Sequence, residues 1–482
     1  MGYKAGVDKQ QLSLMPVCID DYIPADHICR VISAFVEQLD MIALGFKYAE
    51  WKDRGCRPYD PCMMLCLYIY GYLHRVRSSR RLEAETTRNV EVMWLMNELK
   101  PDDKTICNFR KDNTKALGET FRTFNRMCRE LDLYGGEVVA TGGTKFRANN
   151  SRKNNHNATT VGKELSRLDK RINEYLAALE QGDKEDAEER CPDTVAIKAA
   201  LERLQQRKGV VEELRKRVGQ EGEVSTVDPD SRLMRSGGDA RPLDVCYNVQ
   251  TVVDAKHHLI VGFDIAERSD DKGNLHAMSG QAKALLEVEA LACLADKGYY
   301  DGADIAACEA GGVTCLAAKP KPGGAKKEAG FTRRDFGYDR ETDTYECPGG
   351  NQLRYMRDQK HSDGKTCRVY ANYAACGECP FKDQCTKGGH RRILRSPHQD
   401  VLDVVDGRTR AHKDLYRKRQ EIVEHPFGTI KAVWGYKQFL CRKKAKVAAE
   451  TALAYLAYNM RRLITIFTGK GDNPAAVIGQ TA

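Results

Sequence analysis

The aspartate at position 296 stands in a setting typical of a ligand-binding carboxylate. It follows the apolar run 291–295 directly and is followed by Lys297 and Gly298. The apolar run predicts a buried strand, and α/β proteins place their ligands at the carboxyl ends of such strands. Lys297 can face a phosphate group there. On spacing alone, an aspartate and a glycine that only form a turn are the alternative interpretation.

Glu424 is the second acidic residue of this kind. It lies in the segment 416–431, whose apolar residues at positions 422, 423 and 427 predict an amphipathic helix. Arg419 and Lys431 flank it along the chain. A carboxylate among cations suits a place where a divalent metal ion and a phosphate meet. A solvated helix with salt bridges on its surface is the alternative.

Four cysteines between these two acids have the composition of a zinc site. Cys376 and Cys379 form a C-x2-C pair, and Cys347 and Cys385 supply two further thiols. Four thiolates around a Zn²⁺ ion would stabilise a segment that has few apolar residues of its own. Free cysteines in a loop are the alternative to this structural zinc.

Length and composition place the protein in the ordinary globular class. The chain has 482 residues, which corresponds to roughly three domains. Lys and Arg outnumber Asp and Glu by 77 to 68, an excess that suits a polyanionic partner without requiring one. The apolar runs are shorter than the ~20 residues of a membrane span, the first residues lack a signal-peptide pattern, and 18 cysteines are few for a disulfide scaffold. We expect a reduced, cytoplasmic protein without a membrane segment.

Residues 1–135 predict a helical domain. Apolar residues recur close to a 3.6-residue period over 26–44, and a second helix is expected over 60–73, with Asp60 as its N-cap and Pro61 at its first position. The basic cluster after this helix contains four arginines that could bind phosphate: Arg75, Arg77, Arg80 and Arg81. A DNA-binding domain and a helical bundle whose charged face meets only water fit this pattern equally well.

Residues 136–468 predict an α/β core with two insertions. Strands are expected at 137–141, 245–253, 259–265, 291–295 and 313–318, and helices at 276–289 and 304–310. The alternation of apolar strands with helices indicates a mixed sheet. The spaced apolar residues of 163–220 predict an inserted helical hairpin, and 320–400 forms a Cys-rich, basic insertion. We expect the last residues, 469–482, to form a flexible tail.

Short blocks of residues along the chain resemble those of a known family. They are Arg57-Pro58-Tyr59-Asp60-Pro61, Ser79-Arg80-Arg81-Leu82-Glu83, Thr105-Ile106-Cys107-Asn108-Phe109-Arg110, Gly143-Thr144-Lys145, Tyr247-Asn248-Val249-Gln250-Thr251, Ala295-Asp296-Lys297-Gly298-Tyr299 and Val423-Glu424-His425-Pro426-Phe427-Gly428. In this order they resemble bacterial insertion-sequence transposases of the DDE type, which have an InsH-type N-terminal domain and an RNase H-like catalytic core. The set Tyr416, Arg419, Glu424 and Lys431 is similar to the Tyr-Arg-Glu-Lys signature of related transposases.

This resemblance implies a metal-dependent DNA transposase. Asp296 and Glu424 would be its second and third catalytic acids and would hold Mg²⁺ or Mn²⁺ ions. Its partner would be double-stranded DNA, both the terminal inverted repeats and the target. Beyond the four arginines, the side chains expected to contact this DNA are Lys145, Lys297, Arg419 and Lys431. Because two DNA ends must be joined, we expect a homodimer or a larger assembly associated with the nucleoid.

The first catalytic acid of the family is absent. The family pattern Asp-Gly-Thr-Lys here reads Gly142-Gly143-Thr144-Lys145, so a residue without a side chain occupies the first acidic position. We therefore expect that this protein folds but cleaves DNA poorly or not at all. A non-catalytic DNA-binding protein, either a decayed transposase or a repressor, and a metal-dependent nuclease without strand transfer are the alternative functions.

Overall fold

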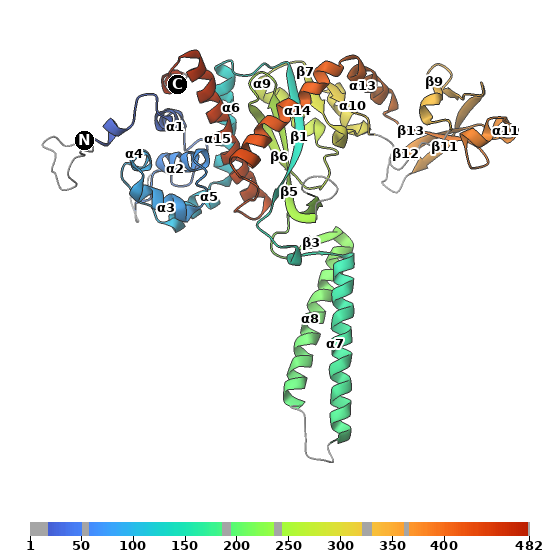
Figure 1. Cartoon of the computed structure of the whole chain (residues 1–482), viewed down its shortest axis with the longest axis horizontal. Coiled ribbons are helices and arrows are strands. Elements are labelled where there is room, and N and C mark those ends of the chain that lie inside the picture. The colour runs from blue at the N-terminus through green and yellow to red at the C-terminus, as the bar shows by residue number, and fades with distance from the viewer. Residues whose placement is uncertain are drawn as a thin grey trace, which may run out of the picture.

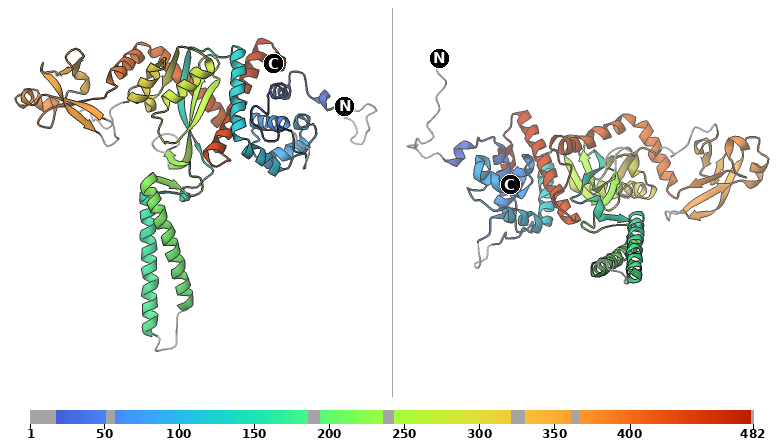
Figure 2. Two further views of the ribbon diagram at one scale, coloured as in Figure 1. Left: turned by 180° about the vertical axis from the view of Figure 1, so that it is seen from behind. Right: turned by 60° about the horizontal axis from the view of Figure 1, so that its bottom comes forward.

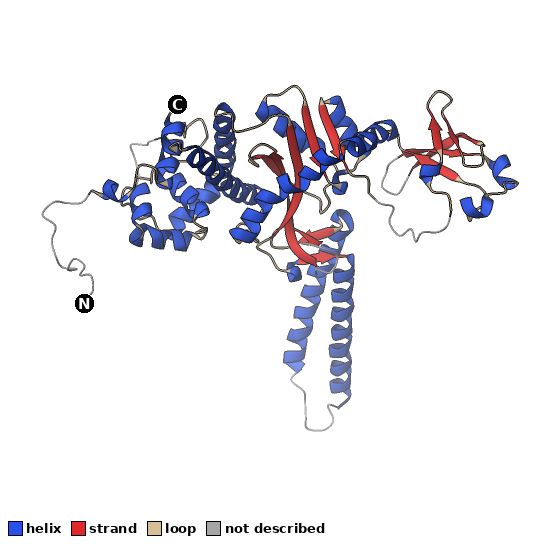
Figure 3. Ribbon diagram, turned by 45° about the horizontal axis from the view of Figure 1, so that its top comes forward, coloured by secondary structure: helices blue, strands red, loops and turns tan. Residues whose placement is uncertain are grey.

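The protein has an elongated body from which a long helical hairpin projects (Figure 1). The computed structural model describes residues 18–50, 57–185, 194–235, 243–320, 330–360 and 366–480. The N-terminal helices form one end of the body, a mixed sheet with its helices forms the middle, and a second, smaller sheet forms the other end (Figures 1 and 3). In the described ranges, no helix is both long and apolar enough to cross a bilayer.

The N-terminal part is helical, as predicted. Its elements are η1 (Ile19–Tyr22), α1 (Ile28–Glu37), α2 (Pro61–Leu73), α3 (Ser79–Arg88), α4 (Val90–Leu95), α5 (Asp103–Asp112) and α6 (Thr114–Glu130). The predicted start of α2 is confirmed, because Asp60 Oδ1 accepts a hydrogen bond from Cys62 N at 2.8 Å. Helix α1 is shorter than the predicted 26–44. The chain turns after it, where Asp40 Oδ1 accepts hydrogen bonds from the backbone N–H groups of Ile42 and Ala43.

The central sheet is mixed, which confirms the predicted α/β core. Its strands are β1 (Val138–Arg147), β4 (Arg232–Arg235), β5 (Leu243–Asp254), β6 (Ile260–Ala266), β7 (Leu291–Ala295) and β8 (Val313–Ala317). Strands β1, β7 and β8 are parallel, whereas β5 is antiparallel to β1, and β4 and β6 are antiparallel to β5. Strand β1 is longer than the predicted 137–141. It continues through Gly142 and Gly143 because both glycines pair with β5.

The two faces of this sheet are covered by different helices. Gly142 faces Val423 of α14 (Lys413–Phe427), because a Cβ atom on this glycine would lie inside 3.0 Å of the Val423 side chain. Gly262, which is in register with Thr141 through β5, would place its Cβ 2.9 Å from Gln281 of α9 (Leu275–Leu286). Since neighbouring residues of a strand point to opposite faces, α14 and α9 lie on opposite sides of β1. Figure 1 shows α14 crossing β1, and Figure 2 shows the molecule from behind.

Three of the helices around the sheet correspond to those predicted at 276–289, 304–310 and 416–431, whereas the helix Gln399–Ala411 was not predicted. The helices around the sheet are α9 (Leu275–Leu286), η3 (Lys297–Tyr299), α10 (Gly302–Ala310), α13 (Gln399–Ala411), α14 (Lys413–Phe427) and η5 (Gly428–Val433), a π-helical turn that continues α14. Proline 426 lies in the last turn of α14 and lacks the N–H that the helix would use there.

The last two helices join the N-terminal part to the sheet. Helix α15 (Lys444–Lys470) packs on α2, α6 and β6, and its Asn459 accepts from Ile260 N and donates to Asn125 Oδ1, both at 2.8 Å. The N-terminal helices and the sheet therefore share one hydrophobic core. The predicted flexible tail 469–482 is wrong in its described part. Helix α16 (Pro474–Gly479) packs on α1, and Ile478 is 0% exposed.

Both predicted insertions are separate from this core and have apolar clusters of their own. The hairpin consists of α7 (Ala158–Glu185) and α8 (Thr194–Glu221), and next to its base are η2 (Arg152–Asn154), β2 (Asn155–Asn157) and β3 (Glu223–Ser225). The Cys-rich insertion consists of η4 (Arg333–Asp335), β9 (Gly337–Asp339), β10 (Thr344–Glu346), β11 (Gln352–Lys360), β12 (Thr366–Ala371), α11 (Tyr373–Gly377), α12 (Lys382–Cys385) and β13 (Arg392–Arg395). Their small clusters, centred on Leu165 and Tyr370, support each insertion locally.

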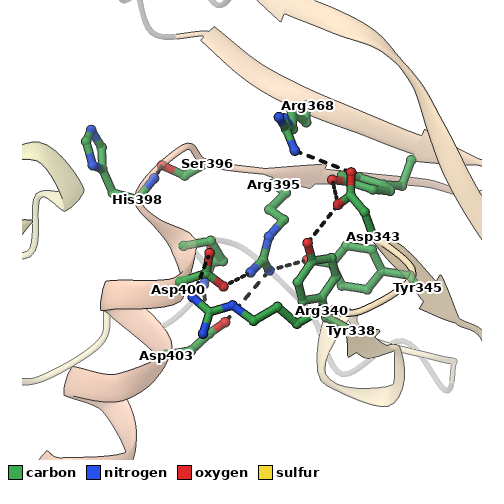
Figure 4. Close-up of polar contacts among 12 residues, drawn as sticks. Tyr338, Arg340, Asp343, Tyr345, Arg368, Arg395, Ser396, His398, Asp400 and Asp403 are labelled. Carbon is green, nitrogen blue, oxygen red and sulfur yellow. Dashed lines mark hydrogen bonds and ion pairs between the residues drawn. The ribbon is translucent and has the colours of Figure 1, made fainter.

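One buried arginine attaches the Cys-rich insertion to the core (Figure 4). Arg395 is 4% exposed, lies 3.5 Å from the ring centre of Tyr338 and donates a hydrogen bond to Tyr345 Oη at 2.9 Å. Its guanidinium also pairs with Asp400 and Asp403 of α13. The side chain thus connects the small sheet with a helix of the central domain, and a buried cation in this position is stabilised by two carboxylates and an aromatic face.

Candidate functional site

Asp296 lies at the carboxyl end of β7, where its sequence context places it. The side chain is half-buried, and its Oδ1 accepts a hydrogen bond from Gly298 N at 2.7 Å. Because Thr141 of β1 is in register with Ala295 of β7, Asp296 lies level with Gly142 on the neighbouring strand. The site expected for the missing acid and the second acid are therefore adjacent in the sheet.

Helix α14 brings the segment of Glu424 over the same two strands. The hydroxyl of Tyr416, near the start of the helix, donates a hydrogen bond to Ala295 O at 3.2 Å, next to Asp296. Two turns later, Val423 packs on Gly142 of β1. Glu424 follows Val423 and is exposed. Helix α14 thus lies over the ends of β1 and β7, with Val423 at Gly142 and Tyr416 next to Asp296.

The space beside Gly142 is filled by the helix. Gly142 is buried, and a Cβ atom on it would lie inside 3.0 Å of Val423 Cγ1 and 3.5 Å from Phe427 Cε2. Valine is branched at Cβ and has one strongly preferred rotamer in a helix, so its methyl groups do not turn aside easily. The absence of a side chain at position 142 is therefore matched by close packing of α14 on β1.

Lys431, at the end of the π-helical turn, is bound to the end of β1. Its Nζ donates to Thr144 Oγ1 at 2.7 Å and to Lys145 O at 2.6 Å, and it lies 4.6 Å from the ring centre of Phe146. Burial lowers the pKa of Lys431 to about 8, and the charge of Lys145 acts in the same direction, whereas Cys246 and Glu424 oppose it. This ammonium is thus partly desolvated and near its titration point at neutral to mildly alkaline pH.

A third carboxylate, which the sequence reasoning missed, lies at this edge of the sheet. Asp271 is in the loop between β6 and α9, and its Oδ1 accepts hydrogen bonds from Asn248 Nδ2 at 2.9 Å and Gln250 Nε2 at 2.8 Å. The available signal was weaker than for Asp296, because Asp271 stands six positions after the predicted strand 259–265 rather than directly after it. Asn248 and Gln250 belong to a block that carried the family resemblance but had no assigned role.

The predicted DNA-contacting residues divide into exposed and enclosed ones. Arg75, Arg80, Arg81 and Lys297 are exposed, whereas Lys145, Arg419 and Lys431 are partly buried. Arg80 forms one weak surface pair, with Asp103 at 3.3 Å. Such a pair leaves the guanidinium accessible to a phosphate group.

Arg77 differs from the other arginines of the basic cluster, because its charge is used inside the protein. Its Nη1 donates to Gln438 O at 3.0 Å and lies 3.3 Å from Glu450 Oε1, while its guanidinium lies 4.1 Å from the ring centre of Tyr436. The side chain of Glu450 is 2% exposed. The expected role of Arg77 in binding DNA is thus corrected by its position: the residue neutralises a buried carboxylate.

The four cysteines of the expected zinc site share one environment without meeting closely. Burial raises the pKa of Cys385, the cation of Arg391 lowers it, and the thiols of Cys376, Cys347 and Cys379 raise it further. Their sulfur atoms are of the type that Zn²⁺ prefers. In the described residues, however, the set of three metal-binding side chains with atoms within 4.8 Å of one another is His27, Cys29 and Glu91, and no three of the four cysteines come this close.

Two segments of the chain match known protein families. Residues 17–112 match the family described as Transposase domain (DUF772), and residues 346–464 match the family described as Transposase DDE domain. The second match contains the Cys-rich insertion from β10 onward, the Glu424 helix and most of α15. No curated protein and no solved structure matches the chain.

Proposed function

We propose that this chain, two segments of which match transposase families, binds the terminal inverted repeats of its element and carries out metal-dependent cleavage and joining of these DNA ends. The single observation that supports this best is the position of α14, which lies over β1 with Val423 on Gly142 and with Tyr416 bonded to Ala295 O, next to Asp296. The strand order β6-β5-β1-β7-β8 is that expected of an RNase H-like core. A protein with this activity acts in the cytoplasm, at the nucleoid.

The carboxylates of Asp296 and Glu424 would hold the divalent ions, Mg²⁺ or Mn²⁺, because these hard cations prefer oxygen ligands. When bound, such ions make a water molecule or a DNA 3′-hydroxyl a better nucleophile and stabilise the leaving oxygen. Arg419 and Lys297, which lie on the segments that carry the two acids, would bind the phosphates of the DNA backbone next to the reacting bond. Their charges position the strand and carry no sequence information.

Recognition of the inverted repeats would belong to the N-terminal helices. Arg75, Arg80 and Arg81 are exposed there and lie within a short stretch of chain. Clustered cations of this kind bind phosphate with strong salt dependence. Because strand transfer needs both ends of the element, we propose that the protein works as a homodimer or a larger assembly on DNA.

The test is a cleavage and strand-transfer assay on DNA that carries the inverted repeats of the element, with Mg²⁺ or Mn²⁺. The wild-type protein is compared with Asp296→Asn and Glu424→Gln, which keep side-chain size but remove the charge. Cleavage at the repeats that both variants lose supports the transposase. Binding of the repeats without cleavage by the wild type favours a non-catalytic DNA-binding protein, which the glycine at position 142 would explain. Cleavage that ignores the repeats favours a nuclease.

We also propose a structural Zn²⁺ ion at Cys347, Cys376, Cys379 and Cys385, supported by the C-x2-C spacing of Cys376 and Cys379 and by the packing of Cys347 and Cys385 against the same small apolar cluster. Binding requires these thiols to approach one another and to lose their protons. Elemental analysis should give close to one zinc per chain, which the variant Cys376→Ser/Cys379→Ser loses. Cys367→Ser, in a neighbouring strand, is the control that keeps the metal. Wild-type protein without zinc contradicts the proposal.

A further inference from the structure

The site has lost one acid at position 142, and the structure holds a further acid, Asp271, beside Asp296. We propose that Asp271 and Asp296 together bind the divalent metal ion of the site, with Asp271 reaching β1 on the face opposite to the one that Gly142 presents to α14. This inference rests on the proposed transposase function and extends it to a residue outside the family's three acidic positions.

The topology brings Asp271 to the same edge of the sheet as Asp296. Strand β6 is antiparallel to β5, and β5 is antiparallel to β1, so β6 runs in the same direction as β1 and β7. Asp271 lies in the loop after β6, and Asp296 directly follows β7. Both acids therefore extend from carboxyl ends of strands, on either side of β1, where open α/β sheets bind ligands.

Two glycines leave the space that the pair of carboxylates occupies. A Cβ atom on Gly298 would lie 2.9 Å from Asp296 Oδ1 and 3.2 Å from Asp271 Oδ2, so both carboxylates border the same point. A Cβ atom on Gly143 would lie inside 3.0 Å of Asp271 Oδ1. Any larger residue at position 143 would push Asp271 away from β1. The second glycine of the pair thus has a role of its own: it admits an acid that approaches from the loop.

The side chain of Asp271 is held with one oxygen bound and the other left for a ligand. Both amide donors, Asn248 Nδ2 and Gln250 Nε2, go to Oδ1, and no residue in the described ranges donates to Oδ2. Asn248 and Gln250 are each 0% exposed, and the hydroxyl of Tyr299 donates to Gln250 Oε1. This buried chain of hydrogen bonds orients Asp271, as is usual for the partners of metal ligands.

The donor chemistry fits a hard divalent cation. Asp271 and Asp296 offer carboxylate oxygens that border a common point at the mouth of the sheet, and Glu424 lies on the helix that covers the opposite side of β1. Mg²⁺ and Mn²⁺ are bound by sets of this composition together with water and phosphate oxygens. The alternative role for Asp271 is that of a hydrogen-bond acceptor that only fixes its loop, and an asparagine would largely fulfil that role.

The test measures Mn²⁺ binding to the full-length protein by isothermal titration calorimetry and by the Mn²⁺ electron paramagnetic resonance signal, without DNA. The variants are Asp271→Asn and Asp296→Asn, and Asp270→Asn is the matched control, because Asp270 is adjacent in the chain but pairs with Arg268 at 2.9 Å. We expect both Asp271→Asn and Asp296→Asn to weaken Mn²⁺ binding about tenfold or more, while Asp270→Asn binds as the wild type does.

A second variant keeps all the carboxylates. Gly143→Ala should displace Asp271 and also weaken Mn²⁺ binding, with the thermal unfolding of the metal-free protein as the check on folding. If Asp271→Asn and Gly143→Ala bind Mn²⁺ like the wild type while Asp296→Asn does not, the role of Asp271 is refuted and the transposase site stands. If the wild type does not bind Mn²⁺, or if Asp296→Asn binds it unchanged, the proposed metal site itself is refuted together with this inference.

Discussion

Restoring the family's acid by Gly142→Asp should destabilise the protein rather than repair it. The Cβ atom alone would lie inside 3.0 Å of Val423 Cγ1, and Phe427 Cε2 is 3.5 Å away. Overpacking of a well-filled core costs about 1–3 kcal/mol, and this cost should appear already in Gly142→Ala. The carboxyl group of the aspartate is then placed under a helix, and a buried polar group without partners adds about 1–3 kcal/mol.

The assay is thermal unfolding of the wild type, Gly142→Ala, Val423→Ala and the double variant, followed by circular dichroism. Because the clash involves these two side chains, their effects should not add: Val423→Ala should relieve most of the cost of Gly142→Ala, with a coupling of about 1 kcal/mol or more. For a cooperative unit of several hundred residues, each kcal/mol moves the unfolding midpoint by about 1–2 °C. An unchanged midpoint for Gly142→Ala, or strictly additive effects, would refute the packing argument.

The same packing governs activity. Gly142→Asp alone should not increase DNA cleavage, whereas Gly142→Asp with Val423→Ala leaves room for the carboxylate between β1 and α14 and should cleave at least as well as the single variant. Addition of Mg²⁺ should then stabilise the double variant more than the single one, because a ligand that binds only the folded state raises its stability. Greater activity of Gly142→Asp by itself would show that α14 moves freely.

Three further predictions concern other parts of the chain. Arg77→Ala should lower the free energy of unfolding by about 1–3 kcal/mol, because it removes the ion pair of the buried Glu450, which keeps its hydrogen bonds from the backbone N–H groups of Leu440 and Cys441. The exposed Arg80→Ala should lower it by less than about 1 kcal/mol and weaken DNA binding in a salt-dependent way. Equal stabilities of the two variants in urea unfolding would contradict this assignment. Burial lowers the pKa of Lys431 to about 8, so this lysine loses its charge as the pH rises through that value. DNA affinity should then fall about fivefold, or ~1 kcal/mol, relative to the variant Lys431→Arg, which stays charged. Parallel pH profiles of the two proteins in fluorescence anisotropy would be inconsistent with a DNA contact. Arg395→Ala should release the Cys-rich insertion from α13. Limited proteolysis around the insertion should then be faster, while the melting temperature of the core stays almost unchanged. Equal digestion rates for the variant and the wild type would exclude the arginine as the attachment point.

Local features were predictable from neighbouring residues because their causes lie within a few positions of the chain. The start of α2 depends on the hydrogen bond between Asp60 and Cys62 and on the fixed backbone angle of Pro61. The strand before Asp296 follows from its unbroken apolar run, and the helix that carries Glu424 follows from the spacing of its apolar residues. The full length of β1 was missed, because the strand is continued past its apolar part by pairing with β5, which lies about a hundred residues later in the chain.

By itself, the sequence indicated a transposase family, most strands of the central sheet in their order, and the position of two acids at a strand end and on a helix. Only the tertiary structure decided what surrounds them. It placed Val423 against Gly142, turned Arg77 inward to Glu450 and put Asp271 beside Asp296. Each of these results depends on which strands are neighbours and on how a helix crosses them, and such contacts between distant segments follow from packing of the whole core rather than from any local pattern of residues.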